Sequence, residues 1–255
     1  MNIGQYKSLF DRDGFVAIRQ FLPAAELQEL TDNLDRYIRV VVPGLPVTAA
    51  FYQDRQRPET LKQLQHMGGD PFFAQYGQQP RWQTLAAALV GEAVEAQQPE
   101  WFNKPPGTDH ATPPHQDNFY FCLRPPNVVT LWLALDAVDE ENGCLRYVAG
   151  SHRLGIRPHA ATAVIGFSQG ISDYGPMDQS QEQAIHLQPG DLVAHHGGTI
   201  HRADANRSAA RNRRAFAMVF RGKSCQRDEA AYARYLAALN AQHQRAGLAT
   251  ANQQK

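Results

Sequence analysis

The chain has 255 residues and a formal charge of zero, because 25 lysines and arginines balance 25 aspartates and glutamates. This balance excludes a chain-wide basic field of the kind that binds nucleic acid or a membrane surface, and no apolar run is long enough to span a bilayer. Three widely spaced cysteines fit reduced thiols better than a disulfide framework. The first fifteen residues lack the basic and apolar regions of a secretory signal, so we expect a cytoplasmic protein.

Helical periodicity is strongest towards the two ends of the chain, where proline or glycine marks the start or the end of several apolar stripes. We expect helices over residues 3–13, 24–42, 81–91 and 227–246, and a short buried strand in FVAIRQFL, residues 15–22. The stretch 42–60 has no period and predicts an ordered loop that borders a site. Tyr52 is the residue of this loop that we expect to face a ligand.

From about residue 94 onward, short strand-like runs alternate with turns, which is the pattern of a barrel or a sandwich. We expect strands at 94–103, 115–121, 128–135, 144–148, 183–187, 191–195, 199–203 and 213–221. Residues 150–182 are too long for a hairpin turn and predict an insert that acts as a lid near the mouth of the barrel. Since no repeat or low-complexity tract interrupts it, the chain 1–255 predicts one mainly β domain with packed helices.

The run His115-Gln116-Asp117 places two metal-binding side chains close together. On a β-strand, residues i and i+2 point the same way, so His115 and Asp117 would reach one metal ion while Gln116 faces the other side. A second cluster, LVAHHGGTIHRADANRS, adds three histidines, which are His195, His196 and His201. Two histidines and one carboxylate form the facial triad of non-haem ferrous oxygenases. A zinc hydrolase is disfavoured, because the chain has no H-E-x-x-H helix.

Five segments of the chain stand in an order and at a spacing that are shared with one enzyme family. They are YKSLFDRDGFVAIRQFLPAAELQEL, FNKPPG, HQDNFYF, TLWLALDAVDEENGCLRYVAGSH, and the distal histidine with its following N-R-S and paired arginines. Together they resemble the phytanoyl-CoA dioxygenase family of iron(II)- and 2-oxoglutarate-dependent oxygenases. The resemblance runs through most of the chain and implies a double-stranded β-helix, the cupin-like jelly roll. It also implies Fe(II), 2-oxoglutarate and O2 as reaction partners, and a small-molecule substrate that is hydroxylated.

The resemblance assigns the metal ligands residue by residue. His115 and Asp117 match the family's H-x-D, and His201 matches its distal histidine because Asn206 follows five positions later. The two adjacent histidines of AHH remain rivals for the third ligand. Related halogenases lack the carboxylate, so the presence of Asp117 favours hydroxylation.

The family pairs the remote carboxylate of 2-oxoglutarate with an arginine on the strand after the distal histidine, a task that suits a bidentate guanidinium. The run RNRRAF offers Arg211, Arg213 and Arg214. Arg213 matches best by its place before the strand, and Arg214 stays open because the preceding loop is one residue longer than usual.

Other residues are expected near the cosubstrate for the same reason. Trp132 matches a tryptophan that lines the family's cosubstrate pocket, and Lys104 matches the lysine of its K-P-P segment. Relatives often carry serine or glycine where this chain has Ala203. We therefore expect Thr130 or Thr199 to supply the hydroxyl contact to 2-oxoglutarate.

Basic residues gather around the H-x-D segment and at the start of the insert, and basic groups in a cleft concentrate anions. We expect a small, polar, anionic substrate, for example an aminoalkylphosphonate, whose amine would meet Glu100, Asp109 or Asp173. The residues expected to contact it are Tyr52, Glu100, His110, Asn118, Tyr120, Arg124 and Asp173. The alternatives are an acyl-CoA or natural-product substrate, or a jelly-roll binding module without enzyme activity.

Overall fold

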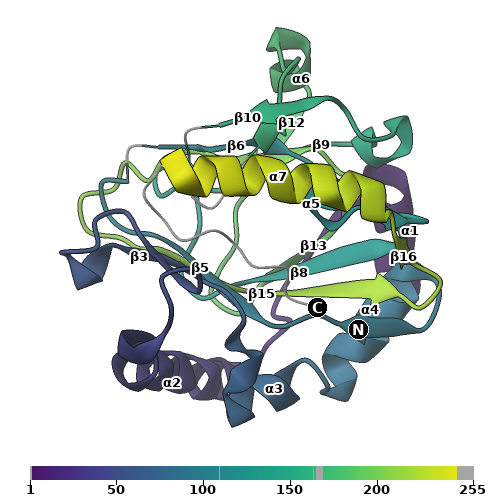
Figure 1. The fold of residues 1–255 in the computed structure, drawn as a ribbon. Helices are drawn as coiled ribbons and strands as arrows, with labels where there is room; N and C mark the ends of the chain where they lie inside the picture. Colours follow the sequence, from purple (N-terminus) through teal and green to yellow (C-terminus); the bar gives the residue numbers. More distant parts are fainter. Residues whose placement is uncertain (1, 109, 163, 165–168, 246–255) are drawn as a thin grey trace.

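The computed structural model describes residues 2–108, 110–162, 164 and 169–245. Two β-sheets face each other at its centre, and helices cover the outer side of the larger sheet (Figure 1). The strand pairings recorded for the described residues of these sheets are antiparallel. The prediction of a mainly β fold with packed helices is therefore confirmed.

The larger sheet consists of β1 (Phe15–Ile18), β2 (Ala50–Tyr52), β3 (Leu61–Leu64), β4 (Val94–Ala96), β5 (Glu100–Lys104), β8 (Val128–Ala134), β13 (Leu192–His196) and β15 (Arg213–Gly222). Their order is β1-β13-β8-β15-β5-β3-β2, and β4 pairs with β15. The smaller sheet consists of β6 (Thr112–His115), β9 (Leu145–Val148), β12 (Glu182–Ile185) and β14 (His201–Ala203), in the order β12-β9-β14-β6. A separate short ladder joins β7 (Leu123–Arg124) to β16 (Gln226–Arg227).

The central strand β8 is buried along its whole length, which explains its nearly unbroken apolar sequence VVTLWLA. Val129, Leu131 and Leu133 belong to the core on the helix side of the sheet. Trp132 lies in the apolar layer between the two sheets. That inner layer is rich in short side chains, which include Ala134, Ala203, Ala215 and Ala217. Alanines fill less space than the branched residues that pack the interior of a small closed barrel.

The helices are α1 (Ile3–Asp13), α2 (Ala24–Val40), α3 (Pro71–Tyr76), α4 (Pro80–Val90), α5 (Asp117–Phe121), α6 (Pro176–Ser180) and α7 (Glu229–Arg245), with short 3-10 turns at Val42–Gly44, Pro58–Thr60, Met67–Gly69 and Ser151–Leu154. Helices α2, α3 and α4 lie on the outer face of the larger sheet (Figure 1), where Leu34, Phe73 and Trp82 are buried. None of the helices in the described part of the chain is long and apolar enough to cross a membrane.

The predicted strand at 115–121 is wrong. Strand β6 ends at His115, Gln116 is extended, and Asp117 begins the short helix α5. The aromatic run NFYF favours a strand by propensity, but Asn118 holds the turn. Its backbone N–H donates to the Gly197 carbonyl at 2.8 Å, and its side-chain amide donates to the Leu123 carbonyl at 3.0 Å. The two metal-binding side chains are thus brought together by the end of a strand and the start of a helix.

The unbroken loop predicted at 42–60 is also wrong, because β2 lies within it and pairs with β3. Tyr52 ends β2, and its ring packs against the helix-side core. The strand expected at 94–103 is divided into β4 and β5, and the strand expected at 15–22 ends at Ile18. The remaining expected strands and helices are confirmed, with ends that agree to within two residues.

The insert 150–182 contains β10 (His159–Ala161), β11 (Gln169–Ile171) and α6. The side chain of Gln116 joins it to the metal-binding segment. The Gln116 amide donates to the carbonyls of Gly155 and Gly198 at 2.8 and 2.7 Å, and its oxygen accepts from the Arg157 N–H at 2.8 Å. The residue expected to face away from the metal therefore fixes the base of the insert.

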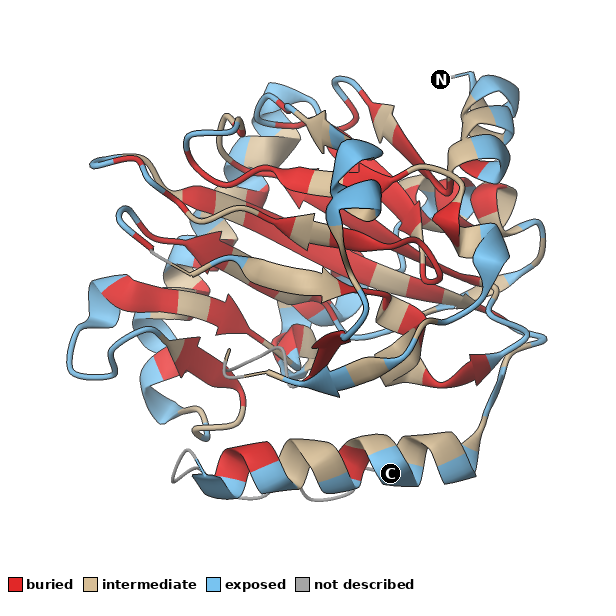
Figure 2. Cartoon of the chain, turned by 90° about the horizontal axis from the view of Figure 1, so that it is seen from above, coloured by how far each residue is buried: buried red, intermediate tan, exposed pale blue. Residues whose placement is uncertain are grey.

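Helix α7 runs along the front of the molecule in Figure 1 and lies along one side of it in Figure 2. The amide of Gln242 donates to the Thr162 carbonyl of the insert at 3.0 Å. The rings of Tyr235 and Tyr120 meet edge to face, with centroids 5.6 Å apart. The insert and α7 therefore contact each other and α5 on the same side of the molecule.

Replacing Leu133 with alanine should lower the free energy of unfolding by about 2–5 kcal/mol, because it removes a fully buried side chain from a packed core. The matched control is Leu154→Ala, since Leu154 is 82% exposed. Chemical denaturation monitored by circular dichroism measures both. Equal losses of stability in the two variants would contradict the assignment of β8 to the centre of the core.

Candidate active site

His115, Asp117 and His201 form a compact cluster between the two sheets. Their ligand atoms all lie within 4.8 Å of one another. His115 and His201 stand opposite each other on the paired strands β6 and β14, and Asp117 Oδ1 lies 3.5 and 3.6 Å from their Nε2 atoms. The three predicted ligands are thus brought together by the fold.

The two histidine rings are held by the backbone with their Nε2 atoms facing the cluster. Nδ1 of His115 lies 2.8 Å from the Pro113 carbonyl, and Nδ1 of His201 lies 3.0 Å from the Thr199 carbonyl. A carbonyl only accepts, so each Nδ1 carries the proton and leaves the Nε2 lone pair free for a metal ion. Burial, with His115 and His195 nearby, holds the pKa of His201 well below its usual value, which favours the neutral ring that a metal ion requires.

Asp117 is largely buried, with 14% of its side chain exposed. Burial alone would raise the pKa of this carboxyl, but His201, His115 and His195 outweigh that effect and hold the pKa well below its usual value. An ionised carboxylate with two neutral imidazoles is a donor set that fits ferrous iron. Most of the surrounding protein is apolar or hydrogen-bonded, so the cluster is a metal centre rather than a surface ion pair.

The two rival histidines lie in different places. Nε2 of His195 lies 3.0 Å from Asp117 Oδ2, next to the cluster but on the other carboxylate oxygen. His196 points away from the cluster, and its ring contacts Phe10 and His152, with centroids 6.1 and 5.4 Å away. The geometry therefore supports His201 as the third ligand.

Arg213 is buried, with 4% exposure, and no carboxylate of the described residues forms an ion pair with it. Its Nε has no hydrogen-bond partner within the described structure. Its guanidinium lies over the ring of Trp132, at 5.3 Å from the centroid. Burial lowers the pKa of Arg213 to about 10, so the group stays charged at neutral pH. A buried cation left without a counter-ion fits the carboxylate of a bound 2-oxoglutarate.

The rival arginines are occupied. Arg214 pairs with Asp136 at 2.7 Å on the helix side of the sheet, and Arg211 pairs with Asp139 at 2.8 Å near the surface. Arg213 and Arg214 are neighbours on a strand, so they point to opposite faces. This alternation makes Arg213 the residue that faces the interior between the sheets, as the sequence predicts.

The remaining predicted cosubstrate residues lie around the same interior. Lys104 stands opposite Arg213 in the β5–β15 ladder, and its ammonium donates to the backbone carbonyl of Asp204 at 2.6 Å. Burial, with Arg213 nearby, holds the pKa of Lys104 well below its usual value. The Thr130 hydroxyl donates to Asp117 Oδ2 at 2.7 Å. The alternative, Thr199, donates to the Gly14 carbonyl at 2.8 Å. The contacts of Lys104 and Thr130 with 2-oxoglutarate stay predictions.

Among the residues predicted to bind substrate, Glu100 has the environment best suited to binding a charged group of a ligand. It is partly buried on the inner face of β5, and it forms no ion pair with a described residue. Burial and the charge of Asp117 raise the pKa of Glu100 to about 7, while a hydrogen bond from Gln63 opposes the shift. A desolvated carboxyl near the metal centre, without a cation among the described residues, favours a cationic ligand group.

The other predicted substrate residues are scattered. Tyr120 lies near the metal centre, because its ring centroid is 5.7 Å from that of His115. Asn118 is buried and bound to Leu123, so its role is structural in this conformation. The rest lie farther out. Arg124 is exposed and pairs with Asp228, Asp173 pairs with Arg157, Tyr52 packs on the core, and half-buried His110 adjoins Asp109, which is outside the described residues.

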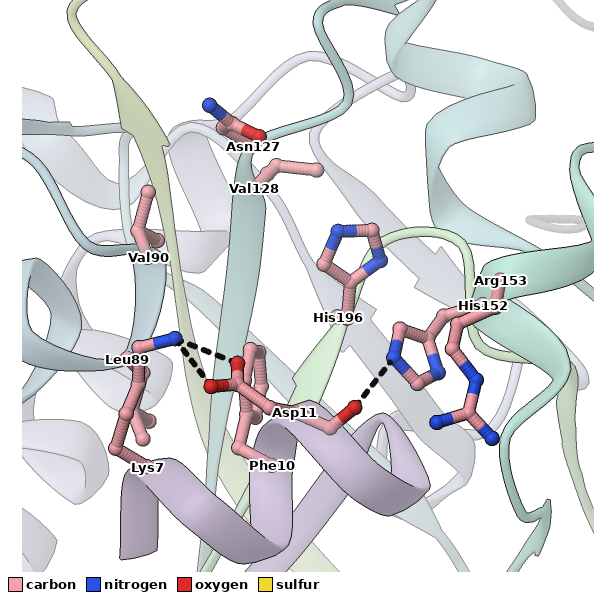
Figure 3. Close-up of a pocket in the computed structure, with 10 residues that line it drawn as sticks. All are labelled: Lys7, Phe10, Asp11, Leu89, Val90, Asn127, Val128, His152, Arg153 and His196. Carbon is pink, nitrogen blue, oxygen red and sulfur yellow. Dashed lines mark hydrogen bonds and ion pairs between the residues drawn. The ribbon is translucent and has the colours of Figure 1, made fainter. Parts of the chain in front are cut away.

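Two cavities open at the surface of the described structure. One, of about 210 Å³, is lined by residues of α1, α4 and the 3-10 turn at Ser151–Leu154; there Lys7 pairs with Asp11 at 2.6 Å and His196 faces the opening (Figure 3). The other, of about 700 Å³, lies between α5 and α7 and is lined by Phe119 and Tyr235 among others. The three triad residues line neither cavity.

Three polar residues near the centre have contacts that the sequence did not reveal. Gln116 anchors the insert, Tyr147 contacts His195, and His159 stacks on Phe119 with ring centroids 3.9 Å apart. Burial lowers the pKa of His159 to about 4. Only Gln116 carried a usable signal, because it stands between two predicted ligands.

Comparison with known proteins agrees with this geometry. The family model for phytanoyl-CoA dioxygenase (PhyH) matches residues 10–215. The peroxisomal phytanoyl-CoA dioxygenase of Mus musculus is 27% identical over 236 residues, which span 87% of this chain and 69% of that protein. The phytanoyl-CoA dioxygenase of Arabidopsis thaliana is 30% identical over 151 residues, 58% of this chain and 52% of that protein.

Solved structures share the fold. EvdO2 from Micromonospora carbonacea var. aurantiaca, complexed with 2-oxoglutarate, has a TM-score of 0.69 and 25% identity, covering 88% of this chain and 91% of that one. The epimerase SnoN, in complex with Fe3+, alpha ketoglutarate and nogalamycin RO, has a TM-score of 0.71 and 22% identity, covering 88% of this chain and 84% of that one. The predicted jelly roll is confirmed.

The fold and the His-Asp-His centre define an iron- and 2-oxoglutarate-dependent oxygenase, so the predicted enzyme class and cofactors are confirmed. The chain belongs to the phytanoyl-CoA dioxygenase family, whose model matches most of its length.

Arg213→Ala should weaken binding of 2-oxoglutarate by about 2–3 kcal/mol, because a desolvated carboxylate loses a charge-assisted partner. The matched control is Arg214→Ala, which should reduce stability through the loss of the Asp136 pair and leave 2-oxoglutarate affinity unchanged. Isothermal titration of the metal-loaded, oxygen-free protein measures both affinities. If Arg214→Ala weakened binding and Arg213→Ala did not, the assignment would be off by one residue.

Glu100→Gln should change how stability depends on pH. The carboxyl has a pKa of about 7 in the folded protein against 4.5 ordinarily, so unfolding releases a proton between these values. The metal-free wild type should therefore lose stability relative to the variant as pH rises from about 4.5 to about 7, with no further divergence outside that window. Denaturant titrations across this range, with exposed Glu95→Gln as the background, test it. Parallel curves would show that Glu100 is not desolvated.

Proposed function

We propose that this protein hydroxylates an aliphatic C–H bond of a small, polar, anionic metabolite, for example an aminoalkylphosphonate, with release of succinate and CO2. The observation that carries the reaction class is the cluster of His115, Asp117 and His201, which shares the interior between the sheets with Arg213, a buried cation without an ion-pair partner among the described residues. Tyr147 lies beside the cluster, because its hydroxyl is 3.0 Å from Nδ1 of His195 and its ring stacks on that of His201 with centroids 5.5 Å apart.

The chain's own residues would divide the work in the following way. His115, Asp117 and His201 would hold ferrous iron, and the Arg213 guanidinium, which lies over the Trp132 ring, would bind the remote carboxylate of 2-oxoglutarate. When bound, iron and 2-oxoglutarate supply the oxidising chemistry with O2. The protein contributes orientation of the reacting groups and an interior from which bulk water is excluded.

The proposal that the substrate carries an amine has more support than the proposal that it carries an anionic group. Glu100 is a partly buried carboxyl on the inner face of β5 without an ion-pair partner among the described residues, and an ammonium group would compensate it. The proposal of an anionic group in the substrate rests on the basic residues of the sequence segment around the metal centre. Arg124 and Arg157 already pair with Asp228 and Asp173, so these two contribute less than the sequence suggested.

An acyl-CoA or a natural product is the alternative substrate class. The curated relatives carry the name phytanoyl-CoA dioxygenase, and SnoN was solved with nogalamycin RO. A binding module without activity is disfavoured, because such a module needs neither three converging metal ligands nor a buried unpaired arginine. We also propose a cytoplasmic location, a single domain, and closure of the site by the insert 150–182; the Gln116 contacts at the base of the insert support the last of these.

His115→Ala and Asp117→Ala should each abolish substrate-dependent succinate formation, because each removes one of three metal ligands. Both side chains lie outside the main helix-side core, so the thermal midpoint of the metal-free protein should stay close to that of the wild type. His196→Ala is the matched control, since its ring points away from the cluster. Normal turnover by either triad variant would refute the metal centre, and unfolding of both would indicate a purely structural cluster.

A panel of aminoalkylphosphonates, their des-amino analogues, zwitterionic solutes and acyl-CoA compounds should separate the substrate classes by succinate release at fixed iron and 2-oxoglutarate. We expect turnover with the aminated compounds, and a preference over the des-amino analogues that Glu100→Gln reduces at least about tenfold, in line with the loss of a desolvated charge partner. Turnover restricted to acyl-CoA compounds would refute the small-metabolite proposal and leave the metal centre intact.

A further inference from the structure

The two oxygens of the Asp117 carboxylate have different surroundings. Oδ1 faces the Nε2 atoms of His115 and His201, at 3.5 and 3.6 Å. Oδ2 faces the larger sheet, where it accepts a hydrogen bond from the Thr130 hydroxyl at 2.7 Å and lies 3.0 Å from Nε2 of His195. One oxygen is therefore turned to the prospective ligands, and the other is held by two protein groups.

The orientation of His195 follows from its two neighbours. An ionised carboxylate only accepts hydrogen bonds, so Nε2 of His195 carries the proton that Asp117 Oδ2 receives. With Nε2 donating, Nδ1 of a neutral ring accepts from the Tyr147 hydroxyl, which lies 3.0 Å away. Tyr147 is fully buried and its ring stacks on Phe15 at 4.6 Å, so it cannot turn away. Tyr147 thus fixes which nitrogen of His195 donates.

Both donors to Oδ2 come from the larger sheet, because Thr130 and His195 are direct partners in the β8–β13 ladder. Both histidines that face Oδ1 come from the smaller sheet. The carboxylate is clamped between the sheets, and rotation of its plane would break two hydrogen bonds, one of them to an imidazole. This fixed orientation decides how many oxygens the carboxylate offers to a metal ion.

We propose that Thr130 and His195 are positioning residues that hold Asp117 in a one-oxygen binding mode, with Tyr147 fixing the ring of His195. A carboxylate can bind a metal ion through one oxygen or two, and the second mode would occupy a coordination position. With Oδ2 retained by its two donors, that position stays available to 2-oxoglutarate. The inference rests on the metal centre proposed above and extends it to residues outside the triad.

The alternative in which His195 is itself a ligand is disfavoured by the same contacts. Its Nε2 carries the proton of the hydrogen bond to Asp117, and its Nδ1 lone pair accepts the hydrogen bond from the Tyr147 hydroxyl. Neither nitrogen offers free electrons to a metal ion. A direct ligand would also have to leave Oδ2, since His195 and the triad histidine His201 approach different oxygens of the carboxylate.

The test uses the double variant Thr130→Val with His195→Phe, which removes both donors and keeps similar volumes. Co(II) is titrated into the oxygen-free protein, and 2-oxoglutarate is then titrated into the Co(II)-loaded protein by calorimetry. We expect the dissociation constant of 2-oxoglutarate to rise at least about tenfold, because it must then displace a carboxylate oxygen from the metal ion, while Co(II) affinity stays unchanged or increases. A purely structural role would not separate the two affinities in this way. His195→Phe alone should show the same separation, and because it keeps the Thr130 hydroxyl it excludes the loss of a direct contact between Thr130 and 2-oxoglutarate.

The matched controls restore the donors. Thr130→Ser with His195→Gln keeps a hydroxyl and an N–H donor, and should recover most of the 2-oxoglutarate affinity. Tyr147→Phe should lose less 2-oxoglutarate affinity than the double variant. In this variant His195 keeps its place, but its proton can move between the two ring nitrogens. If the double variant fails to fold, His195→Phe and Tyr147→Phe as single variants carry the test with the same readouts, because both keep the Thr130 hydroxyl.

Two results would overturn the inference. Unchanged 2-oxoglutarate affinity in a folded double variant would show that the hydrogen bonds to Oδ2 do not affect the binding of 2-oxoglutarate. Parallel loss of Co(II) and 2-oxoglutarate affinity would show that the two residues build the metal centre rather than set the binding mode of Asp117. Failure of the wild type to bind Co(II) would refute the metal centre itself, which is a separate and recognisable outcome.

Discussion

An ionised carboxylate placed largely out of water between two sheets is the constraint on which the rest of this structure depends. Asp117 must find partners for both oxygens, because an unpaired buried charge costs several kcal/mol. The smaller sheet contributes two imidazoles and the larger sheet contributes a hydroxyl and a third imidazole. The two halves of the jelly roll are therefore joined at one charged group, and the position of α5, which carries Asp117, follows from it.

The same interior holds two further ionisable groups that have no ion-pair partner among the described residues. Arg213 is buried without a carboxylate from the described residues, and Glu100 is a desolvated carboxyl without a cation among them. Groups of this kind destabilise a protein by themselves and are retained where a ligand compensates them. Opposite charges on neighbouring strands of one sheet are consistent with two ligands bound side by side, one acidic and one basic.

The sequence predicted the reaction class and the ligand set well, because H-x-D, the distal histidine and the arginine strand are local patterns with definite spacing. It misplaced Asp117 on a strand, since NFYF has strand propensity and the contact of Asn118 with Gly197 is not visible in the sequence. It missed the contact of His195 with Asp117 for a similar reason: the pairing of β8 with β13, which brings His195 beside Thr130, is a long-range feature. Substrate residues were least predictable, because they depend on which charges find partners across the fold.

The alanines between the sheets have a consequence for stability. Each methylene missing from Ala134, Ala203, Ala215 or Ala217 relative to a larger apolar residue forgoes about 0.8 kcal/mol of burial. A ligand that occupied this layer would replace part of that contact. Its binding would raise the free energy of unfolding by RT ln(1 + [L]/Kd), about 2.7 kcal/mol at a hundredfold excess over Kd. By this linkage, the melting temperature would rise with the concentration of any ligand that fills the layer, even when no turnover occurs.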